Sequence, residues 1–159
     1  METSGSLSHL TLSGTLSIVS SRVANVARGY NGDLRAGDRM LQVPARTGSV
    51  NLSWLGSGWS ASVGGSRAID WINYDELGLS RAYSTGTRDV HDMLGQQLRQ
   101  YWRRYDGGLR LHATASRDVR GMFTFEVSGD NLLNYQRNEP DNVTVLPGRT
   151  LTTGLKVKF

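Results

Sequence analysis

The chain has 159 residues, a formal net charge of +4 and a pI of about 9.8, and only 38% of its residues are hydrophobic. The low hydrophobic fraction argues against a large dry core, and the absence of cysteine excludes disulfides, thiol catalysis and cysteine-ligated metals. The arginines are scattered along the chain without a recognition helix or a basic-aromatic strand motif, so the positive charge does not indicate a nucleic-acid partner.

Alternating apolar and polar residues predict β-strands along most of the chain. Nineteen glycines against three prolines suit strands joined by turns better than a helical bundle. In the first strand, for example, Leu10, Leu12, Leu16 and Ile18 alternate with serines and threonines. We therefore expect an all-β, antiparallel up-and-down meander of about six strands, at residues 7–20, 47–55, 58–70, 99–116, 121–130 and 148–159.

The predicted connections differ in length in an ordered way. The turns at 55–58 and 116–121 are short, and a short helix is predicted over 89–98, ahead of the fourth strand. Short turns at one end of the strands and long loops at the other are typical of outer-membrane barrels. Alternation alone also fits a soluble sandwich, because an apolar face can meet a second sheet as well as lipid. The long connections are rich in Gly, Asp, Asn and Arg and lie around 21–46, 71–98 and 131–147.

The residue types on the two faces favour a segment of a large transmembrane β-barrel. The polar faces carry Ser, Thr, Gly and Asn instead of the Lys and Glu that solvate an exposed sheet, which suits a crowded wet lumen. Trp54 and Trp59 flank the first short turn. Aromatic belts at both ends of the strands are what membrane interfaces select. The second predicted belt, towards the long loops, consists of Trp71, Tyr74, Tyr101, Trp102 and Tyr105.

The end of the chain resembles the signal by which outer-membrane barrels are recognised for assembly. Residue type and spacing both match, with an aromatic residue at the terminus. A terminal strand must pair with the assembly machinery before it pairs with the first strand of its barrel, so its edge is exposed as a template. The matching residues are Thr152, Gly154, Val157 and Phe159.

Two upstream segments resemble the end of TonB-dependent outer-membrane receptors. That family commonly has an Asn-Leu-aromatic segment with a later Tyr after the penultimate strand, and then a Pro-Gly-Arg that leads into the last strand. This chain departs slightly, because Leu133 stands where an aromatic residue is common. The segment 41–46, with its Val-Pro step, is also similar to the family. The positions that carry the resemblance are Asn131, Leu132, Asn134, Tyr135, Pro147, Gly148 and Arg149.

The resemblance implies a receptor that takes up a scarce ligand, such as a ferric siderophore or a corrinoid, and that is not an enzyme and needs no cofactor. Its partners would be outer-membrane lipid, the barrel-assembly machinery, and the remaining strands and plug of the receptor. TonB would act only through N-terminal parts outside this chain. The alternatives are a passive porin-like outer-membrane barrel and a soluble β-sandwich binding module.

Residues with catalytic or metal-binding chemistry are sparse. His9, His91 and His112 are widely separated and lack the close spacing of a metal site, so no metal is expected. His91 lies between two nearby aspartates in a long loop, where solvation is the expected role. No nucleophile and base are spaced to indicate an enzyme. From topology alone, the candidate ligand-facing residues are Asp70, Tyr74 and Arg103.

Overall fold

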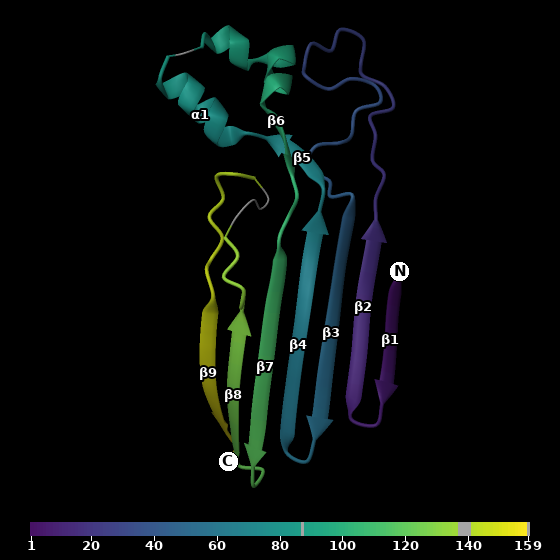
Figure 1. Cartoon of the computed structure of the whole chain (residues 1–159), viewed down its shortest axis with the longest axis vertical. Coiled ribbons are helices and arrows are strands. Elements are labelled where there is room, and N and C mark those ends of the chain that lie inside the picture. Colours follow the sequence, from purple (N-terminus) through teal and green to yellow (C-terminus); the bar gives the residue numbers. More distant parts are fainter. Residues whose placement is uncertain (87, 137–140, 159) are drawn as a thin grey trace.

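The computed structural model describes residues 1–86, 88–136 and 141–158. The described chain forms a seven-stranded antiparallel sheet in the order β1-β2-β3-β4-β7-β8-β9 and a two-stranded sheet, β5-β6 (Figure 1). The large sheet consists of β1 (Glu2–Leu7), β2 (Leu10–Ile18), β3 (Arg46–Gly56), β4 (Trp59–Ile69), β7 (Leu109–Val119), β8 (Phe123–Asp130) and β9 (Thr150–Val157). The other elements are β5 (Trp71–Tyr74), β6 (Trp102–Tyr105), the helix α1 (Glu76–Ser84) and the 3₁₀ helices η1 (Val90–Met93) and η2 (Gly95–Tyr101).

The large sheet is an up-and-down meander whose short turns all lie at one end (Figure 1). Gly58 closes the two-residue β3–β4 turn with φ 73°, a conformation that glycine adopts without steric cost. The β1–β2 turn contains Ser8 with φ 52°, and the β7–β8 turn contains Gly121 with φ 70°. The described residues of the three long connections, 19–45, 70–108 and 131–149, lie at the opposite end. The predicted alternation of turns and loops is therefore observed.

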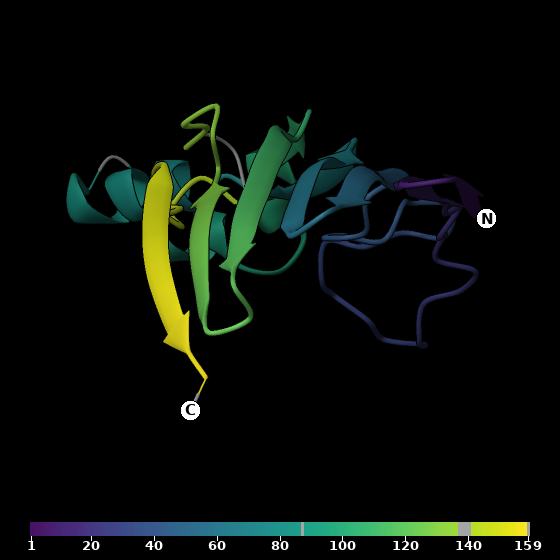
Figure 2. The ribbon, with the colours of Figure 1, turned by 90° about the horizontal axis from the view of Figure 1, so that it is seen from below.

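The large sheet is a single curved layer (Figure 2). Among the described residues, the buried hydrophobic side chains are Trp71, Met93 and Tyr105, and none of them belongs to the seven-stranded sheet. The rings of Trp71 and Tyr105 stack with centroids 5.9 Å apart, across the β5–β6 pair. The small apolar core thus lies in the folded loops, which we call the cap (residues 19–45, 70–86, 88–108, 131–136 and 141–149), and not under the sheet.

The cap begins where the chain leaves β4. Asp70 has φ 62°, which breaks the strand and redirects the chain into β5. Asp75 then caps α1, because its Oδ1 accepts a hydrogen bond from the Gly78 amide at 2.9 Å. Its carboxylate also accepts a hydrogen bond from Asn142, in the last connection, so α1 is joined to a distant part of the cap.

The prediction of an all-β antiparallel meander is confirmed, but the number of about six strands is wrong, because the described residues contain nine. The predicted strand 7–20 corresponds to β2, and β1, which precedes it and pairs with it through a turn at residues 8 and 9, was not predicted. The predicted strand 99–116 is interrupted, because Gly107 has φ 71° and separates β6 from β7. The predicted turn 116–121 lies further along, at 120–122, since β7 continues to Val119. The predicted helix over 89–98 is present as the 3₁₀ helices η1 and η2.

Candidate membrane-facing surface and polar cap

One face of the large sheet is apolar and exposed on the described strands β2 to β9. The cross-strand register sets Leu12, Leu52 and Val63 side by side, and the same row continues to Ala113 and Leu151. Exposed fractions are high for apolar side chains, reaching 73% at Ile18, 58% at Val50, 53% at Phe125 and 70% at Leu151. Contiguous apolar surface of this extent marks contact with another apolar phase or partner.

The opposite face carries hydroxyl groups that pair across the strands. Thr15 and Ser49, Ser60 and Ser116, and Ser62 and Thr114 each have their side-chain oxygens 2.7 Å apart. His112 lies in the same face, where its ring and the Asn51 side chain stand over the bare Cα of Gly64. The pairs satisfy small polar groups within the sheet, so this face is polar.

Aromatic side chains mark the turn end of the apolar face. Trp54 and Trp59 are 39% and 43% exposed, on either side of the β3–β4 turn. The Arg117 guanidinium lies over the Trp59 ring, 4.7 Å from its centroid. At the loop end the prediction of a second belt is wrong for two of its members, because Trp71 and Tyr105 are buried at 4% and 1% exposure inside the cap.

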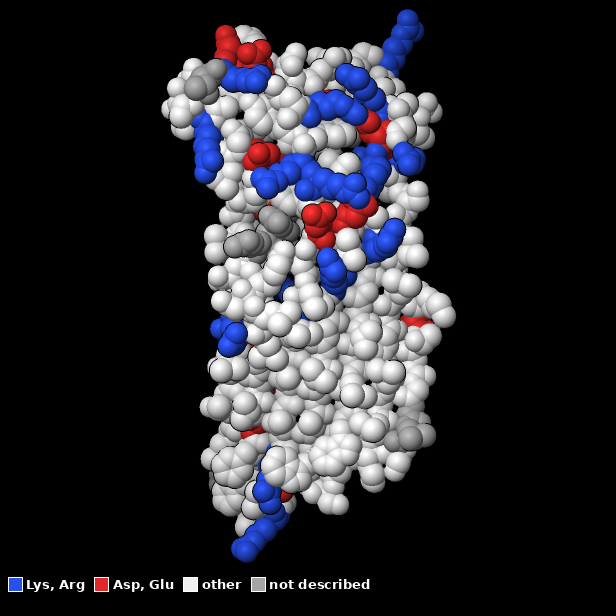
Figure 3. All heavy atoms as spheres, in the orientation of Figure 1, with Lys and Arg blue, Asp and Glu red and all other residues white. Residues whose placement is uncertain are grey.

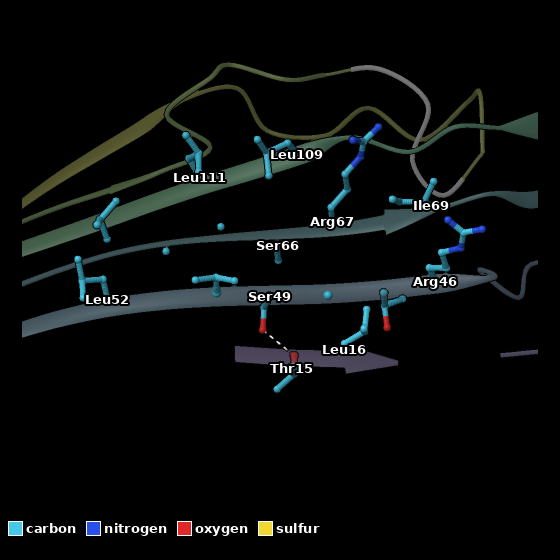
Figure 4. A pocket seen from close by; sticks show the side chains of 16 residues that line it. Thr15, Leu16, Arg46, Ser49, Leu52, Ser66, Arg67, Ile69, Leu109 and Leu111 are labelled. Atoms are coloured by element: carbon cyan, nitrogen blue, oxygen red, sulfur yellow. Dashed lines mark hydrogen bonds between the residues drawn. The ribbon is translucent and has the colours of Figure 1, made fainter. Parts of the chain in front are cut away.

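Two glycines hollow the apolar face near the loop end. Gly48 and Gly65 are diagonal neighbours on β3 and β4, and neither contributes a side chain to the face. The leucines beside them reach across, so that a Cβ on Gly65 would stand 2.9 Å from Leu111 Cδ2 and one on Gly48 would stand 3.8 Å from Leu16 Cδ1. A groove of about 670 Å³ results, with Leu16 on one side and Leu109 and Leu111 on the other (Figure 4).

Two arginines stand at the loop end of this groove. Arg46 lies opposite Ile69 and Arg67 lies opposite Gly48, so both side chains share the apolar face. Both are exposed and line the groove (Figure 4). Neither forms an ion pair within residues 1–86, 88–136 and 141–158.

Three arginines of the cap, Arg39, Arg99 and Arg104, each form an ion pair with a carboxylate. Arg99 binds Asp38 through two hydrogen bonds, Nη1 to Oδ2 at 2.5 Å and Nη2 to Oδ1 at 2.7 Å. This fork-shaped contact lowers the pKa of Asp38 below its ordinary value. Figure 3 shows the result, since charged side chains gather over the cap while the strands below carry few of them on the face in view.

A buried carboxylate organises the centre of the cap. Asp33 is 6% exposed, and its Oδ2 accepts hydrogen bonds from the Tyr74 hydroxyl at 2.7 Å and from Trp102 Nε1 at 2.8 Å. Burial, together with this carboxylate, raises the pKa of the Tyr74 hydroxyl well above its ordinary value. Arg99 also stacks on the Trp102 ring, 4.3 Å from its centroid. The cluster fixes β5 and β6 to the first long loop.

The three candidate ligand-facing residues do not form one site. Asp70 is engaged by two arginines, Arg39 Nη1 at 3.1 Å and Arg104 Nε at 2.8 Å, and the hydrogen bond from Arg39 is the main cause of its lowered pKa. Tyr74 is bound to Asp33. Arg103 pairs with Asn73, the residue before Tyr74, so its side chain projects from the opposite face of the β5–β6 ladder. There its guanidinium lies 5.9 Å from the centroid of the Tyr105 ring.

The residues that carry the family resemblance meet in space. Asn131 is 1% exposed, and its Nδ2 donates to the carbonyls of Tyr135 and Pro147 at 2.8 and 2.9 Å while its Oδ1 accepts from the Tyr135 amide at 2.8 Å. The Asn134 side chain accepts a hydrogen bond from the Arg149 amide at 3.0 Å. Leu132 and Gly148 complete the motif. The Leu132 amide donates a hydrogen bond to the Leu111 carbonyl oxygen at 2.9 Å, and Gly148 lies against the Asn134 side chain.

The described residues of the assembly-signal segment belong to β9, at the edge of the sheet. Val157 pairs with Phe123 on the apolar face, whereas Thr152 and Gly154 are on the polar face. Within the described strands, β9 pairs with β8 on one side only. Phe159 lies outside the described residues.

Sequence reasoning missed the Arg46 and Arg67 pair and the carboxylates Asp33 and Asp38. The arginines could have been found from the strand periodicity, because each lies at an apolar-face position of its strand. In each strand a glycine occupies a neighbouring position of the same face. The carboxylates carry no such signal, since they lie in irregular loops. The described part of the chain contains no group of three or more His, Asp or Glu side chains arranged to hold a metal ion.

None of the helices in the described residues has the length and apolar character needed to cross a membrane. Comparison with family models, with curated proteins and with solved structures gives no match for this chain. The surfaces described above are therefore the basis for a functional proposal.

Proposed function

We propose that this chain is a wall segment of a TonB-dependent outer-membrane receptor, which takes up a scarce ligand such as a ferric siderophore or a corrinoid. The chain would contribute strands, outer loops and the closing strand β9. The observation that carries the proposal is the single-layer sheet with one apolar, exposed face, short turns at one end and a folded polar cap at the other.

Physical chemistry supports lipid as the phase that covers the apolar face. The three longest strands, β3, β4 and β7, have 11 residues each, close to the roughly 9–11 residues with which a tilted strand crosses a bilayer. Apolar surface left in water costs about 25 cal/mol per Å², and the described residues contain no second layer to bury it. A soluble sandwich is less well supported for the same reason.

The cap favours a receptor over a passive porin-like barrel. The motif residues that resemble the receptor family are joined by hydrogen bonds between Asn131 and Pro147 and between Asn134 and Arg149. The motif residues at the two ends of the β8–β9 connection thus contact one another. This contact supports the resemblance to the receptor family. The resemblance implies that loops and a plug domain of the receptor would select the ligand.

Membrane placement can be tested with single cysteines, because these 159 residues contain none and any cysteine elsewhere in a longer chain can be replaced by serine. Leu52 and Ser53 are successive residues of β3 that face opposite sides of the sheet, so L52C and S53C form a matched pair. The two variants are made in the longest chain encoded by the gene, and outer membranes are isolated from the cells. We expect a membrane-impermeant maleimide to label S53C from the aqueous side. The same reagent should leave L52C unlabelled until the membrane is dissolved. Equal labelling of both cysteines in intact membranes would reject the membrane wall.

Receptor function needs a second measurement. We expect the full-length protein to concentrate its ligand in cells that have TonB and to lose that uptake in cells that lack TonB. A passive barrel would instead conduct small solutes equally in both strains. That result would retain the membrane wall and reject the receptor.

A further inference from the structure

The two free edges of the large sheet run in the same direction. β1 ends at Leu7, where the turn to β2 begins, and β9 ends at Val157, which pairs with Phe123 beside the β7–β8 turn. Both edge strands thus run from the cap end to the turn end (Figure 1). Antiparallel pairing requires opposite directions, so β9 cannot pair in this way with an edge of another copy that has its turns on the same side of the membrane.

Several glycines of the inner strands lie beneath the side chain of the residue directly opposite in the ladder. A Cβ added to any of them would stand 2.6 to 3.8 Å from that side chain. Such a neighbour shields the bare backbone of the glycine and fills the space that its missing side chain leaves. These pairs are Gly14 with Val50, Gly48 with Leu16, Gly64 with His112, Gly65 with Leu111, and Gly129 with Leu151.

Gly154, in the edge strand β9, has no such cover. The residue opposite it on β8 is Glu126, but the atom nearest to an added Cβ would be Glu126 Cβ, at 4.0 Å. The glycine of the other edge strand, Gly5, is also bare, with no atom within 4 Å of an added Cβ. Among the described strands of the large sheet, the two uncovered glycines are therefore the two that have a neighbouring strand on one side only.

Glu126 indicates what kind of side chain would cover Gly154. Its carboxylate is exposed on the polar face and forms no hydrogen bond or ion pair in the described part of the chain. Directly opposite residues have Cβ atoms about 4.5–5.5 Å apart, so a large side chain that lies over Gly154 from the free edge would end beside this carboxylate. A hydrogen-bond donor at its tip would bind the carboxylate.

We propose that the strand that closes the β9 edge carries a large side chain with a hydrogen-bond donor, of the kind that tyrosine or arginine has, directly opposite Gly154. This side chain covers the glycine on the polar face and binds Glu126. The partner is a strand of the same receptor that runs from the turn end to the cap end, since no edge of a second copy has that direction. The inference rests on the proposed function, which makes β9 the closing strand of a barrel.

Disulfide mapping identifies the residue opposite Gly154. The longest chain encoded by the gene is refolded into phosphatidylcholine vesicles without the assembly machinery, so that any role of Gly154 in the assembly signal does not enter. G154C is combined in turn with a cysteine at each position of the first strand of the barrel, and other cysteines are replaced by serine. After oxidation with copper phenanthroline we expect the disulfide yield to peak at one position, because directly opposite residues are close enough for the bond. The natural residue at that position should be large and carry a donor.

A second set of variants tests the cover itself. G154L places a branched side chain in the space that the partner residue should fill. We expect it to lower the ratio of closed to open barrel on the order of tenfold, since overpacking of a filled site is destabilising. Truncation of the mapped partner residue to alanine should restore closure in the G154L background. Closure is measured by the compact band that unheated protein forms in gel electrophoresis and that heating removes.

K156L is the matched control for G154L. Lys156 lies two residues further along the same face of β9, and its own long side chain already fills that position. K156L therefore adds leucine to the face without adding bulk, and it should close as the natural protein does.

A glycine, alanine or serine at the mapped position would overturn the proposed cover and leave closure by β9 intact. G154L that closes as well as K156L would do the same. A large residue without a donor, such as leucine, would overturn the contact with Glu126. Disulfides of G154C with a second copy of the chain, and with no position of the first strand, would overturn both the cover and the closing role of β9.

Discussion

The side-chain amide of Asn131 donates a hydrogen bond to the carbonyl oxygen of Pro147, 2.9 Å away, and so joins the beginning of the β8–β9 connection to its end. The same side chain exchanges two further hydrogen bonds with Tyr135. The Tyr135 hydroxyl in turn donates to Gly107 O at 3.2 Å, which ties the connection to the start of β7. Asn131 therefore holds the cap onto the last strands.

Replacement of Asn131 by alanine is expected to destabilise the cap by about 2–4 kcal/mol, because three buried hydrogen bonds are lost and two carbonyls are left without this donor. Asn131 also has φ 47°, so N131G should be less destabilised than N131A, by up to about 1 kcal/mol. Proteolysis within 131–149 and thermal melting in detergent measure both effects. L133A, at a 52% exposed position, is the control and should change stability by less than about 0.5 kcal/mol. An N131A protein as stable as L133A would contradict the clamp.

The Asp33 cluster leads to a second prediction. D33A leaves the Tyr74 hydroxyl and the Trp102 indole without their acceptor, and we expect a loss of about 2–4 kcal/mol in cap stability. Y74F removes a single hydrogen bond to a carboxylate and should cost about 1.5–3 kcal/mol. R103A, on the opposite face of the ladder, is the control, because it removes only the contact of the guanidinium with the Tyr105 ring and should cost less than about 1 kcal/mol. Tryptophan fluorescence during denaturant unfolding reports these changes, and equal effects of Y74F and R103A would refute the proposed role of Asp33.

The carboxylates paired with arginine predict an acid-sensitive cap. Hydrogen bonds from Arg99 and Arg39 lower the folded-state pKa values of Asp38 and Asp70. Their stabilising contribution is complete above the ordinary carboxyl pKa of about 4 and is lost as the pH falls through the lowered values. Limited proteolysis between pH 7 and 2 should find a cap of constant resistance down to about pH 5 and weaker resistance below about pH 4.

The double variant D38N/D70N separates these pairs from other acid effects. It should be less resistant at neutral pH, because Arg39, Arg99 and Arg104 all lose an ionic partner, and its resistance should change less on acidification. Profiles that run parallel for the variant and the natural protein would show that other groups set the acid sensitivity.

Strands were predictable from sequence where apolar residues alternate without interruption. Leu10 to Ile18 in β2 and Leu151 to Val157 in β9 have this pattern, and both strands are present. In β1 the apolar face begins with Thr3 and Gly5, which give no hydrophobic signal, and the strand forms because it pairs with β2 along its length. Tertiary pairing, which a local pattern does not encode, decides such segments.

The candidate sites show the same limit more strongly. Side chains in irregular loops, such as Asp33 and Asp38, meet partners more than 30 residues away, and no spacing rule connects them. The ligand-facing role predicted for Asp70 and Tyr74 came from their position after a strand, but both are occupied by partners within the cap. By contrast, Arg46 and Arg67 share the periodicity of their strands, so the strand register alone would have placed them together.

The two open edges of the sheet yield the last prediction. β1 and β9 each pair on one side only among the described strands, and the apolar face between them is exposed. Unpaired edges and apolar surface both promote association, so the isolated 159-residue chain should form large assemblies in water and disperse in detergent. Sedimentation velocity in the two media measures this. Substituting Leu151 and Leu155 of β9 by serine should reduce association in water only in part, because the remaining strands keep their apolar side chains. A monodisperse monomer in detergent-free buffer would contradict both the expected association and the membrane wall proposed above.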